Sequence, residues 1–163
     1  MSVNVDTRVV PPGSDDYVDA AWDLKEGIRR SEGVLKQQRG FFVDAYRRST
    51  VYCYIAQGPS EEGELIAFAS TRRDGYILFL AVAPEFRSDG YGKRLVATVA
   101  EHHQSVTCHA RTTNHNALDF YEHLGFEIQR RINGYYEDGG DAYYLRLGDD
   151  ASLREKLSRF IGF

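Results

Sequence analysis

Two glycines stand two residues apart behind an arginine in the segment EFRSDGYGKRL, residues 85–95, which leads into an expected helix. Glycines at a strand-to-helix junction let the backbone approach a ligand without interference from a Cβ atom. The first turn of the helix presents unpaired N–H groups and a partial positive charge at the same place. This glycine segment therefore predicts a site for a phosphate or pyrophosphate group.

The spacing of the glycine segment separates it from two common nucleotide-binding loops. A P-loop requires GxxxxGK[ST], and a Rossmann loop requires GxGxxG with an acidic residue about 20 residues later. Here the pattern is RxxGxG, formed by Arg87, Gly90 and Gly92. By itself this pattern leaves open a plain turn into a helix that binds nothing.

A histidine in an expected strand is the side chain best suited by type to remove a proton near neutral pH. His109 lies in the segment SVTCHAR, and an unperturbed histidine has a pKa of about 6.5. A strand histidine that only packs or hydrogen-bonds is the alternative. Cys108 alternates with His109, so we expect it on the opposite face as a core thiol rather than an acyl-carrying nucleophile. The other histidines form no HExxH or HxH pattern, so no metal site is predicted.

The hydrophobic pattern predicts the elements that position these residues. Strands are expected at residues 3–10, 50–57, 64–72, 76–83, 105–111, 126–133 and 141–147. Helices are expected from Ser14 to a break at residues 31–33, around residues 41–46, after the glycine segment, and from Asn114 to Gly125. The first helix is expected to start at Ser14, with the acidic Asp15 and Asp16 in its first turn. Apolar residues cluster in the second helix, namely Phe41, Phe42, Ala45 and Tyr46, and the inward face of the last helix is expected to carry Ala117, Phe120, Tyr121 and Leu124.

The order of these elements, β-α-α-β-β-β-α-β-α-β-β, predicts an α+β fold, in the sense of a three-layer α/β arrangement. We expect a mixed, mostly antiparallel sheet of six to seven strands with helices on both faces. The strand at residues 76–83 is apolar throughout, which is typical of a central strand covered on both faces. Residues 1–148 are expected to form one domain, and residues 149–163 an amphipathic helical extension packed on it.

Composition and charge exclude several classes of protein. The chain has 163 residues, of which 42% are hydrophobic and 27% charged, as in one ordinary globular domain. A net charge of −4 argues against a nucleic-acid-binding protein. Two cysteines without CxxC spacing predict reduced thiols in a cytoplasmic protein. The sequence shows no signal peptide and no apolar run long enough to span a bilayer, so no membrane partner is expected.

The glycine segment and a second segment together resemble a known family. The RxxGxG pattern is similar to the [QR]xxGx[GA] loop with which GNAT acetyltransferases cradle the pyrophosphate of acetyl-CoA. The segment ARTTNHNALDFYEHLGFEIQRRINGYYEDGGDAYYLRL resembles the ribosomal-protein-alanine acetyltransferases and related protein N-terminal acetyltransferases, which carry an NxxAxxFYxxxGF motif and a later YY…DA element. The matching residues are Asn114, Ala117, Phe120, Tyr121, Gly125, Phe126, Tyr135, Tyr136, Asp141 and Ala142. The resemblance spans residues 64–147 and implies the GNAT fold.

The resemblance implies acetyl-CoA as the acyl donor and no metal. The glycine segment is expected to hold the pyrophosphate, whereas backbone groups near Leu80 and Val82 and the side chain of Asn114 hold the pantetheine arm. For Asn114, a helix N-cap is a second role, and both roles could hold at the same time. The residues assigned to acetyl-CoA in this way are Leu80, Val82, Arg87, Ser88, Asp89, Gly90, Tyr91, Gly92, Lys93, Asn114, Ala117 and Tyr121.

The resemblance also implies catalytic roles. Tyr121 stands where the family places the tyrosine that meets the CoA sulfur, so its hydroxyl is the expected general acid; a core aromatic is the alternative. His109 stands where the ribosomal-protein enzymes carry a glutamate and some eukaryotic N-terminal acetyltransferases a histidine, which makes it the candidate general base. Tyr76 is a further candidate for proton handling and for binding the substrate.

Tyr135 and Tyr136 lie in the loop with which the family grips the backbone of a peptide acceptor. An α-amine has a pKa of about 7.7–8.0 and a lysine of about 10.4, so at neutrality the lysine costs roughly 3.5 kcal/mol more to deprotonate. We therefore predict an N-acetyltransferase that acetylates protein N-terminal α-amines by direct attack in a ternary complex, as a monomer or homodimer.

Two departures from the ribosomal-protein enzymes leave the acceptor open. His109 replaces their glutamate, and the segment EGVLKQQRGFFVDAYRRST does not match them. The alternatives are a small-molecule amine or lysine acetyltransferase, and a non-catalytic acyl-CoA-binding regulatory module.

Overall fold

The structure, a computed structural model, describes residues 4–58, 63–148 and 155. The chain divides into two compact units. Unit 1 consists of residues 1–73 and 77–95, and unit 2 consists of residues 74–76 and 96–163. The boundary between them falls inside the third α-helix.

The observed elements follow the predicted order, with a 3-10 helix, η1 (Pro84–Phe86), as an addition before the glycine segment. The strands are β1 (Val5–Val10), β2 (Thr50–Ala56), β3 (Glu64–Thr71), β4 (Ile77–Val82), β5 (Thr107–Arg111), β6 (Phe126–Ile132) and β7 (Ala142–Leu147). The α-helices are α1 (Val18–Glu32), α2 (Arg39–Arg47), α3 (Tyr91–His102) and α4 (His115–His123). The predicted α+β fold with seven strands is confirmed.

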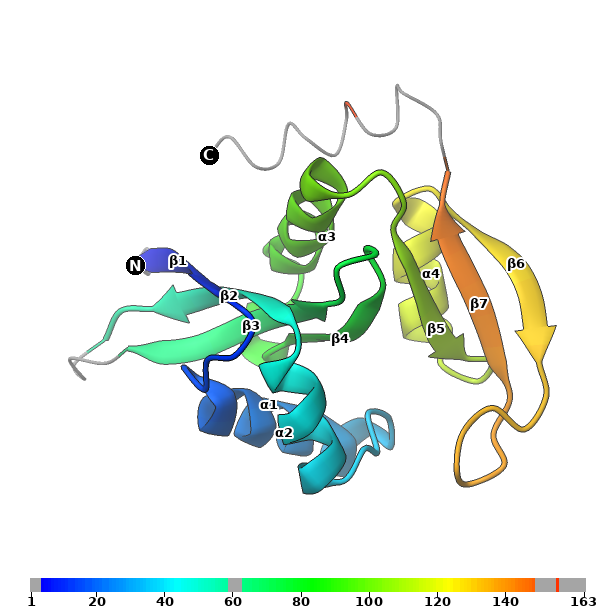
Figure 1. Ribbon diagram of the computed structural model, residues 1–163, viewed down its shortest axis with the longest axis horizontal. Coiled ribbons are helices and arrows are strands. Elements are labelled where there is room, and N and C mark those ends of the chain that lie inside the picture. The colour runs from blue at the N-terminus through cyan, green and yellow to red at the C-terminus, as the bar shows by residue number, and fades with distance from the viewer. Residues whose placement is uncertain (1–3, 59–62, 149–154, 156–163) are drawn as a thin grey trace. The chain divides into compact units, whose positions relative to one another are not determined.

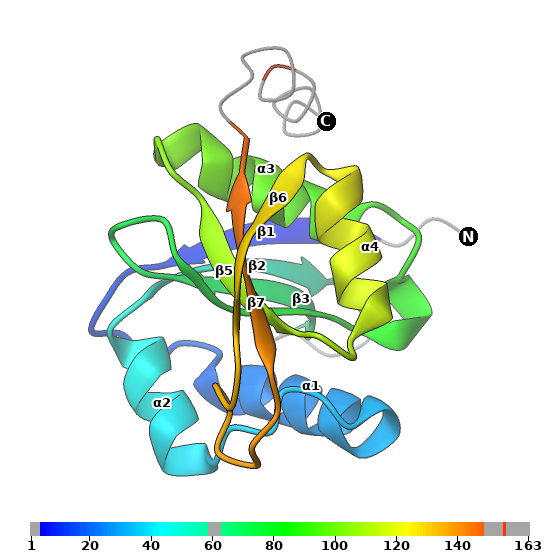
Figure 2. The ribbon, with the colours of Figure 1, turned by 90° about the vertical axis from the view of Figure 1, so that its right-hand side faces the viewer.

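Unit 1 is built on a four-stranded antiparallel sheet in the order β1-β2-β3-β4 (Figure 1). Helices α1 and α2 lie side by side against one face of this sheet (Figure 2). Strand β4 ends the sheet rather than lying in its centre, which corrects the expectation for residues 76–83. Its side chains alternate accordingly: Ile77, Phe79 and Ala81 are buried, whereas Leu80 and Val82 are half-buried.

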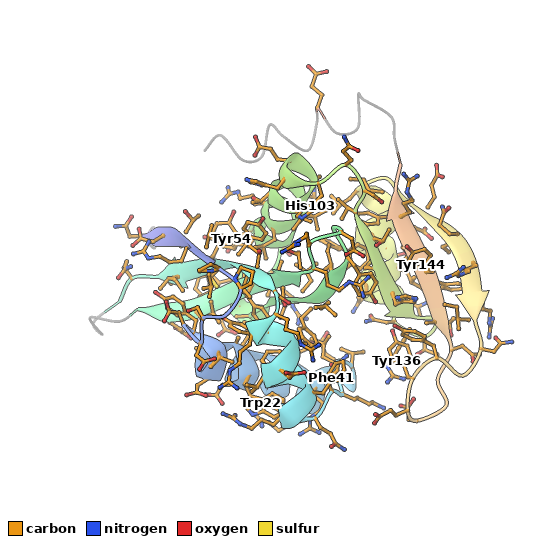
Figure 3. The ribbon with its side chains drawn as sticks, in the orientation of Figure 1. Trp22, Phe41, Tyr54, His103, Tyr136 and Tyr144 are labelled. Atoms are coloured by element: carbon orange, nitrogen blue, oxygen red, sulfur yellow. The ribbon has the colours of Figure 1, made fainter. Side chains whose placement is uncertain are left out.

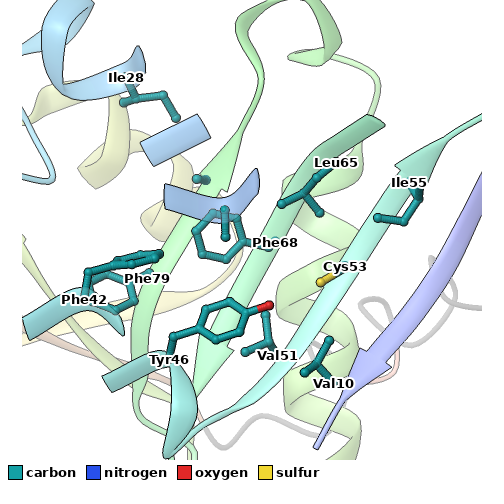
Figure 4. Close-up of a cluster of buried hydrophobic side chains, with 12 residues drawn as sticks. Val10, Ile28, Phe42, Tyr46, Val51, Cys53, Ile55, Leu65, Phe68 and Phe79 are labelled. Atoms are coloured by element: carbon teal, nitrogen blue, oxygen red, sulfur yellow. The ribbon is translucent and has the colours of Figure 1, made fainter. Parts of the chain in front are cut away.

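The core of unit 1 is a cluster of buried side chains between this sheet and the two helices (Figure 4). Phe42 of α2 has no exposed surface, and its ring lies 5.5 Å from Trp22, 6.0 Å from Tyr46, 6.2 Å from Phe68 and 4.8 Å from Phe79 between ring centroids. Burial of each such side chain contributes about 1.5–3 kcal/mol to folding. The helices are therefore held on the sheet mainly by aromatic packing.

The start of α1 differs from the prediction. Ser14 does not cap the helix, which begins at Val18 after Tyr17 adopts a left-handed φ of 64°. The acidic residue expected in the first helical turn, Asp15, instead forms an ion pair with Arg47 at the end of α2, at 2.5 Å. The segment before α1 is thus held by an ion pair with the end of α2 and not by a local N-cap.

Helix α2 also corrects one expectation about its apolar cluster. Phe42 and Tyr46 are buried as predicted, but Phe41 is 60% exposed (Figure 3). Neighbouring positions on a helix point about 100° apart, so a short helix that buries Phe42 against a sheet turns Phe41 toward solvent.

Unit 2 contains a three-stranded antiparallel sheet in the order β5-β7-β6 and helix α4 (Figure 1). Leu118, Tyr121 and Leu124 form the buried face of α4. Ala117 and Phe120, which we expected to point inward, are only half-buried. The buried face of α4 therefore differs from the prediction, because Leu118 is buried in place of its neighbour Ala117.

A single parallel bridge extends this sheet: Tyr76 pairs with Thr107 of β5. The Gly75 carbonyl accepts a hydrogen bond from the Thr107 N–H at 3.2 Å. The seven strands therefore form two antiparallel sheets, and this bridge is the parallel pairing found in the described part of the chain. It places the residue before β4 beside β5.

The expected helix over residues 149–163 lies outside the described residues, apart from Glu155, which is helical. The division into one domain and a helical extension stays a prediction. In the described ranges, no helix combines the length and apolarity that crossing a membrane requires.

Replacement of Gly75 by alanine should destabilise the protein strongly. A Cβ atom there would lie 1.9 Å from the Ser105 carbonyl oxygen, and the φ of +84° already disfavours a side chain. Gly139 has nearly the same φ, +85°, with no atom within 4 Å of an added Cβ, so Gly139→Ala controls for backbone strain alone. In urea unfolding we expect a loss of about 1 kcal/mol for Gly139→Ala and at least about 3 kcal/mol for Gly75→Ala. Equal losses would contradict the close approach.

Both cysteines should be unreactive in the folded protein. Cys53 and Cys108 are free and buried, and burial raises the pKa of each thiol to about 12. At pH 8 a thiol with that pKa is ionised to only about one part in 10⁴, and the thiolate is the reactive form. A colorimetric thiol assay should detect two thiols after denaturation and almost none before it. Rapid reaction in the native Cys53→Ala variant would show that Cys108 is accessible or activated.

Candidate active site

The glycine segment forms an open loop in unit 1. Ser88 and Gly90 both have left-handed backbones, with φ of 72° and 88°, and α3 begins at the next residue, Tyr91. A Cβ atom built on Gly90 would meet no atom within 4 Å. The backbone here therefore needs glycine and leaves open space in front of the first helical turn. An anionic group such as a pyrophosphate fits that combination of space and N–H donors.

Aromatic packing fixes the start of α3 within unit 1. The Tyr91 ring lies 5.1 Å from that of Tyr54 on β2 and 6.2 Å from that of Phe86 in η1. The Arg94 guanidinium stacks over the same ring at 5.5 Å. The glycine segment is consequently held between a 3-10 helix and an anchored α-helix.

Arg87, predicted to contact the pyrophosphate, has a protein partner in this structure. Its two terminal nitrogens bind the Glu32 carboxylate at 3.0 and 2.6 Å. Its Nε donates to the Val82 carbonyl oxygen at 3.3 Å. Val82 is one of the residues whose backbone was expected to bind the pantetheine arm, and its carbonyl is hydrogen-bonded to Arg87 here. The side chain thus joins the loop to the end of α1 and to β4.

His109 and Tyr76, two of the predicted functional residues, are in polar contact within unit 2. The Tyr76 hydroxyl lies 2.6 Å from His109 Nδ1. The Tyr135 ring stacks on the imidazole with centroids 4.2 Å apart and an angle of 10° between the rings. Tyr144, the register partner of His109 on β7, lies 4.9 Å away. The structure therefore brings the candidate base together with the predicted acceptor loop.

Tyr76 supports His109 without acting as a base itself. Burial, and after it a hydrogen bond with Tyr135, raises the pKa of the Tyr76 hydroxyl well above the ordinary value of a tyrosine. A phenol in that environment stays protonated near neutral pH, where it both donates and accepts hydrogen bonds.

Tyr121 contacts Cys108 rather than His109. The two side chains are hydrogen-bonded, and both are buried. Burial is the main cause that raises the pKa of Tyr121 far above its ordinary value. Because successive residues of a strand point to opposite faces, Cys108 and His109 divide the predicted catalytic residues between two faces of β5.

Asn114 caps α4 as one of its two readings predicted. Its side-chain oxygen accepts a hydrogen bond from the Ala117 N–H at 3.2 Å. The cap uses the oxygen of the Asn114 side-chain amide. It leaves the NH₂ group of the same amide for the predicted contact with the pantetheine arm. The two roles are compatible.

The loop between β6 and β7, which carries Tyr135 and Tyr136, is held by charged side chains that the sequence did not single out. The Arg111 guanidinium lies 4.0 Å from the centre of the Tyr136 ring and 3.1 Å from Asp138. Asp141 accepts hydrogen bonds from the Gly134 N–H at 2.8 Å and from an arginine of β6 at 2.7 Å. Burial is the main cause that raises the pKa of the Tyr136 hydroxyl to about 12.

A buried lysine organises the segment between α1 and α2. Lys25 has no exposed surface; its ammonium donates to the Gln37 carbonyl and lies 3.3 Å from Glu26 and 4.4 Å from the centre of the Trp22 ring. Burial lowers its pKa, and the neighbouring Glu26 opposes that change. The spacing places Lys25 on the buried face of α1, four residues after Ala21 and three before Ile28. It was not singled out from the sequence, because a lysine is rarely buried.

Each unit gathers its own share of the predicted residues. Unit 1 carries the residues expected at the phosphates and along β4: Leu80, Val82, Arg87, Ser88, Asp89, Gly90, Tyr91, Gly92 and Lys93. Unit 2 carries the others: Tyr76, His109, Asn114, Ala117, Tyr121, Tyr135 and Tyr136. The described residues include no group of histidine, cysteine or acidic side chains able to hold a metal. Tyr144 was missed, since only the register of β5 and β7 brings it to His109.

Comparison with known proteins gives several similar proteins. N-alpha-acetyltransferase 30 of Homo sapiens is 40% identical over 80 residues, which cover 46% of this chain and 22% of that protein. An N-alpha-acetyltransferase of Sulfolobus acidocaldarius is 26% identical over 146 residues, which cover 76% of this chain and 85% of that protein. The crystal structure of the ribosomal-protein-S18-alanine N-acetyltransferase from Escherichia coli superposes with a TM-score of 0.66 at 21% identity, covering 87% of this chain and 93% of that one.

The human relative is much longer than this chain, which spans 22% of its length, and the likeness to the bacterial structure concerns the fold. The family itself is shown by a longer match, to the acetyltransferase (GNAT) family, over residues 16–126. That match covers more than half of the sequence and includes both the glycine segment and α4. The chain therefore belongs to the acetyltransferase (GNAT) family.

Proposed function

We propose that the protein is an acetyl-CoA-dependent N-acetyltransferase that acetylates protein N-terminal α-amines. The observation that carries the proposal is the contact between candidate base and acceptor loop: His109 is hydrogen-bonded to Tyr76 and stacked on Tyr135. A base placed against the loop that the family uses for peptide backbones favours a peptide amine as the acceptor.

The residues of the glycine segment are assigned to the donor. The open space at Gly90 and the N–H groups of the first turn of α3 suit the pyrophosphate, and the Asn114 amide suits the pantetheine arm. When bound, acetyl-CoA supplies an acetyl group activated as a thioester. No acyl-enzyme on Cys108 is invoked, because its buried thiol has a pKa of about 12. Direct attack by the amine is the simpler route.

His109 takes the proton that the α-amine loses. An α-amine has an ordinary pKa of about 7.7–8.0, close enough to that of histidine, about 6.5, for the transfer to cost little. Tyr76 holds the imidazole through Nδ1. Backbone N–H groups of β4 are the candidates to stabilise negative charge on the acetyl oxygen.

Tyr121 is assigned to the leaving sulfur. Its hydroxyl holds its proton far more tightly than an ordinary thiol, whose pKa is about 8.5, so its main contribution is a hydrogen bond to the developing thiolate. Its buried contact with Cys108 fixes the ring for that purpose.

The names of the relatives support this proposal. Both the human and the archaeal relative are called N-alpha-acetyltransferases. Closer kinship with the ribosomal-protein-alanine enzymes, a cytoplasmic location, and a monomeric or homodimeric state stay predictions.

The test is acetyl transfer to a peptide pool, followed by mass spectrometry. Each peptide carries a free α-amine and an internal lysine, and a matched pool has blocked N-termini. We expect acetylation of the α-amine in the first pool and almost none in the second. Transfer to lysine in both pools, or no transfer despite bound acetyl-CoA, would overturn the N-terminal assignment.

Replacement of Gly90 by valine should abolish acetyl-CoA binding, because the side chain fills the open space in front of α3. Gly13 has a similar φ, +92° against +88°, and equally open surroundings in unit 1, so Gly13→Val controls for strain. Isothermal titration calorimetry should show at least a hundredfold weaker binding for Gly90→Val alone, a loss of roughly 2.7 kcal/mol. Wild-type affinity in that variant would refute the assignment of the glycine segment.

Replacement of Tyr121 by phenylalanine should lower turnover and leave acetyl-CoA affinity nearly unchanged. The ring still fills the core, and only the hydroxyl that serves the leaving sulfur is removed. A loss of about 10²-fold in kcat is expected for one such group. Cys108→Ala, which removes the hydroxyl's partner and keeps Tyr121, is the matched control and should lose much less. Unchanged kcat in Tyr121→Phe would leave this tyrosine a purely structural part of the core.

A further inference from the structure

One row of side chains crosses the sheet of unit 2 on the face that carries His109. Strand register pairs His109 of β5 with Tyr144 of β7, and Tyr144 with Arg130 of β6. The rings of His109 and Tyr144 lie 4.9 Å apart between centroids, and the central carbon of the Arg130 guanidinium lies 5.1 Å from the centre of the Tyr144 ring. A cation therefore stands two strands away from the candidate base, on the same face of the sheet.

Arg130 differs from the other arginines of this face in its partners. Arg111 forms an ion pair with Asp138 at 3.1 Å, and Arg146 stands opposite Glu127 in the register of β6 and β7. Arg130 stands opposite a tyrosine and is exposed; in the described part of the chain its side chain contacts that ring and no carboxylate. The positive charge of Arg130 is therefore available to an anion from outside the protein.

The contact with Tyr144 leaves the Arg130 guanidinium able to bind a carboxylate. A guanidinium that lies over an aromatic ring keeps the edges of its own plane accessible, and its N–H donors lie along those edges. The two oxygens of a carboxylate match two of these donors in geometry and carry the opposite charge. Arg130 is therefore suited to an acidic side chain rather than to a neutral or basic one.

The spacing of the strands relates this charge to the acceptor. Neighbouring strands lie about 4.8 Å apart, so the backbones of His109 and Arg130 are roughly 10 Å apart across β7. An extended peptide advances about 3.3–3.6 Å per residue. Tyr76 adjoins β5 from the other side, because it pairs with Thr107. A peptide whose α-amine lies at His109 and whose chain crosses β7 therefore brings its second or third side chain to Arg130.

We propose that Arg130 is a specificity-determining residue that selects acceptor N-termini with an aspartate or glutamate at the second or third position. This rests on the proposed function, since the α-amine of the acceptor is taken to lie at His109. The net charge of the chain, −4, does not attract acidic peptides, so a preference for them must come from a local cation. The chemical class of the acceptor is then an acidic protein N-terminus.

Acetylation rates of matched peptides test this selection. Each peptide carries glutamate or glutamine, which differ in charge and hardly in size, at position two or three of an otherwise identical sequence, and transfer to the α-amine is followed by mass spectrometry. Wild-type protein should give a kcat/KM at least about fivefold higher for glutamate at one of the two positions, as expected for one charge-assisted hydrogen bond. The ratio should fall at high salt, because exposed charges are screened.

Three substitutions separate the charge of Arg130 from other effects. Arg130→Gln should bring the glutamate-to-glutamine ratio to about one. Arg130→Glu should reverse the selection, so that a peptide with lysine at the same position is acetylated faster than the glutamate peptide, which loss of structure cannot produce. Arg8→Gln removes the same charge from an exposed position of β1 in unit 1, and it should keep the wild-type ratio.

Equal rates for glutamate and glutamine at both positions in the wild-type protein would overturn the proposal, and this comparison needs no variant. A glutamate preference that persists in Arg130→Gln would also overturn it, because another group would then recognise the acid. Either result leaves the proposed function intact, since peptides are still acetylated. If the wild-type protein binds acetyl-CoA but acetylates no peptide, the proposed function itself fails, and the selection fails with it.

Discussion

The close approach of the Gly75 backbone to Ser105 determines which residues meet in unit 2. Only a glycine fits there, since any Cβ would overlap the Ser105 carbonyl. The approach allows Gly75 to pair with Thr107 and brings Tyr76 next to β5. Tyr76 then reaches His109, two residues further along the strand. A backbone contact at the residue before Tyr76 thus sets the surroundings of the candidate base.

The pleat of strand β5 places two groups of candidate residues on opposite faces. One face carries His109 with its aromatic neighbours Tyr76 and Tyr135, which are half-buried or exposed. The other face carries Cys108 under Tyr121, where burial keeps both groups protonated. Groups with different proton affinities can lie close together along one strand because adjacent side chains meet different environments.

In the glycine segment, the open space and the positive charge come from different residues. Its open volume comes from Gly90, whereas its one arginine at a signature position, Arg87, is paired with Glu32. An anion in this loop therefore meets backbone N–H groups first, and the arginine contributes by tying the loop to α1. The ion pair is partly accessible to solvent, so its own contribution to stability is small, about 0–1 kcal/mol.

The sequence predicted the order of elements, the loop before α3 and the family. It could do so because alternating hydrophobic residues in strands, helical spacing and the RxxGxG pattern are local properties. The sequence also marked His109, Tyr121 and Tyr135 as candidates. It did not show that β4 ends its sheet, that Phe41 faces solvent, or that Tyr144 and Arg111 support the site. Those facts depend on strand register and on contacts between residues far apart in the chain. Such contacts are set by packing of the whole fold, which no short stretch of sequence contains.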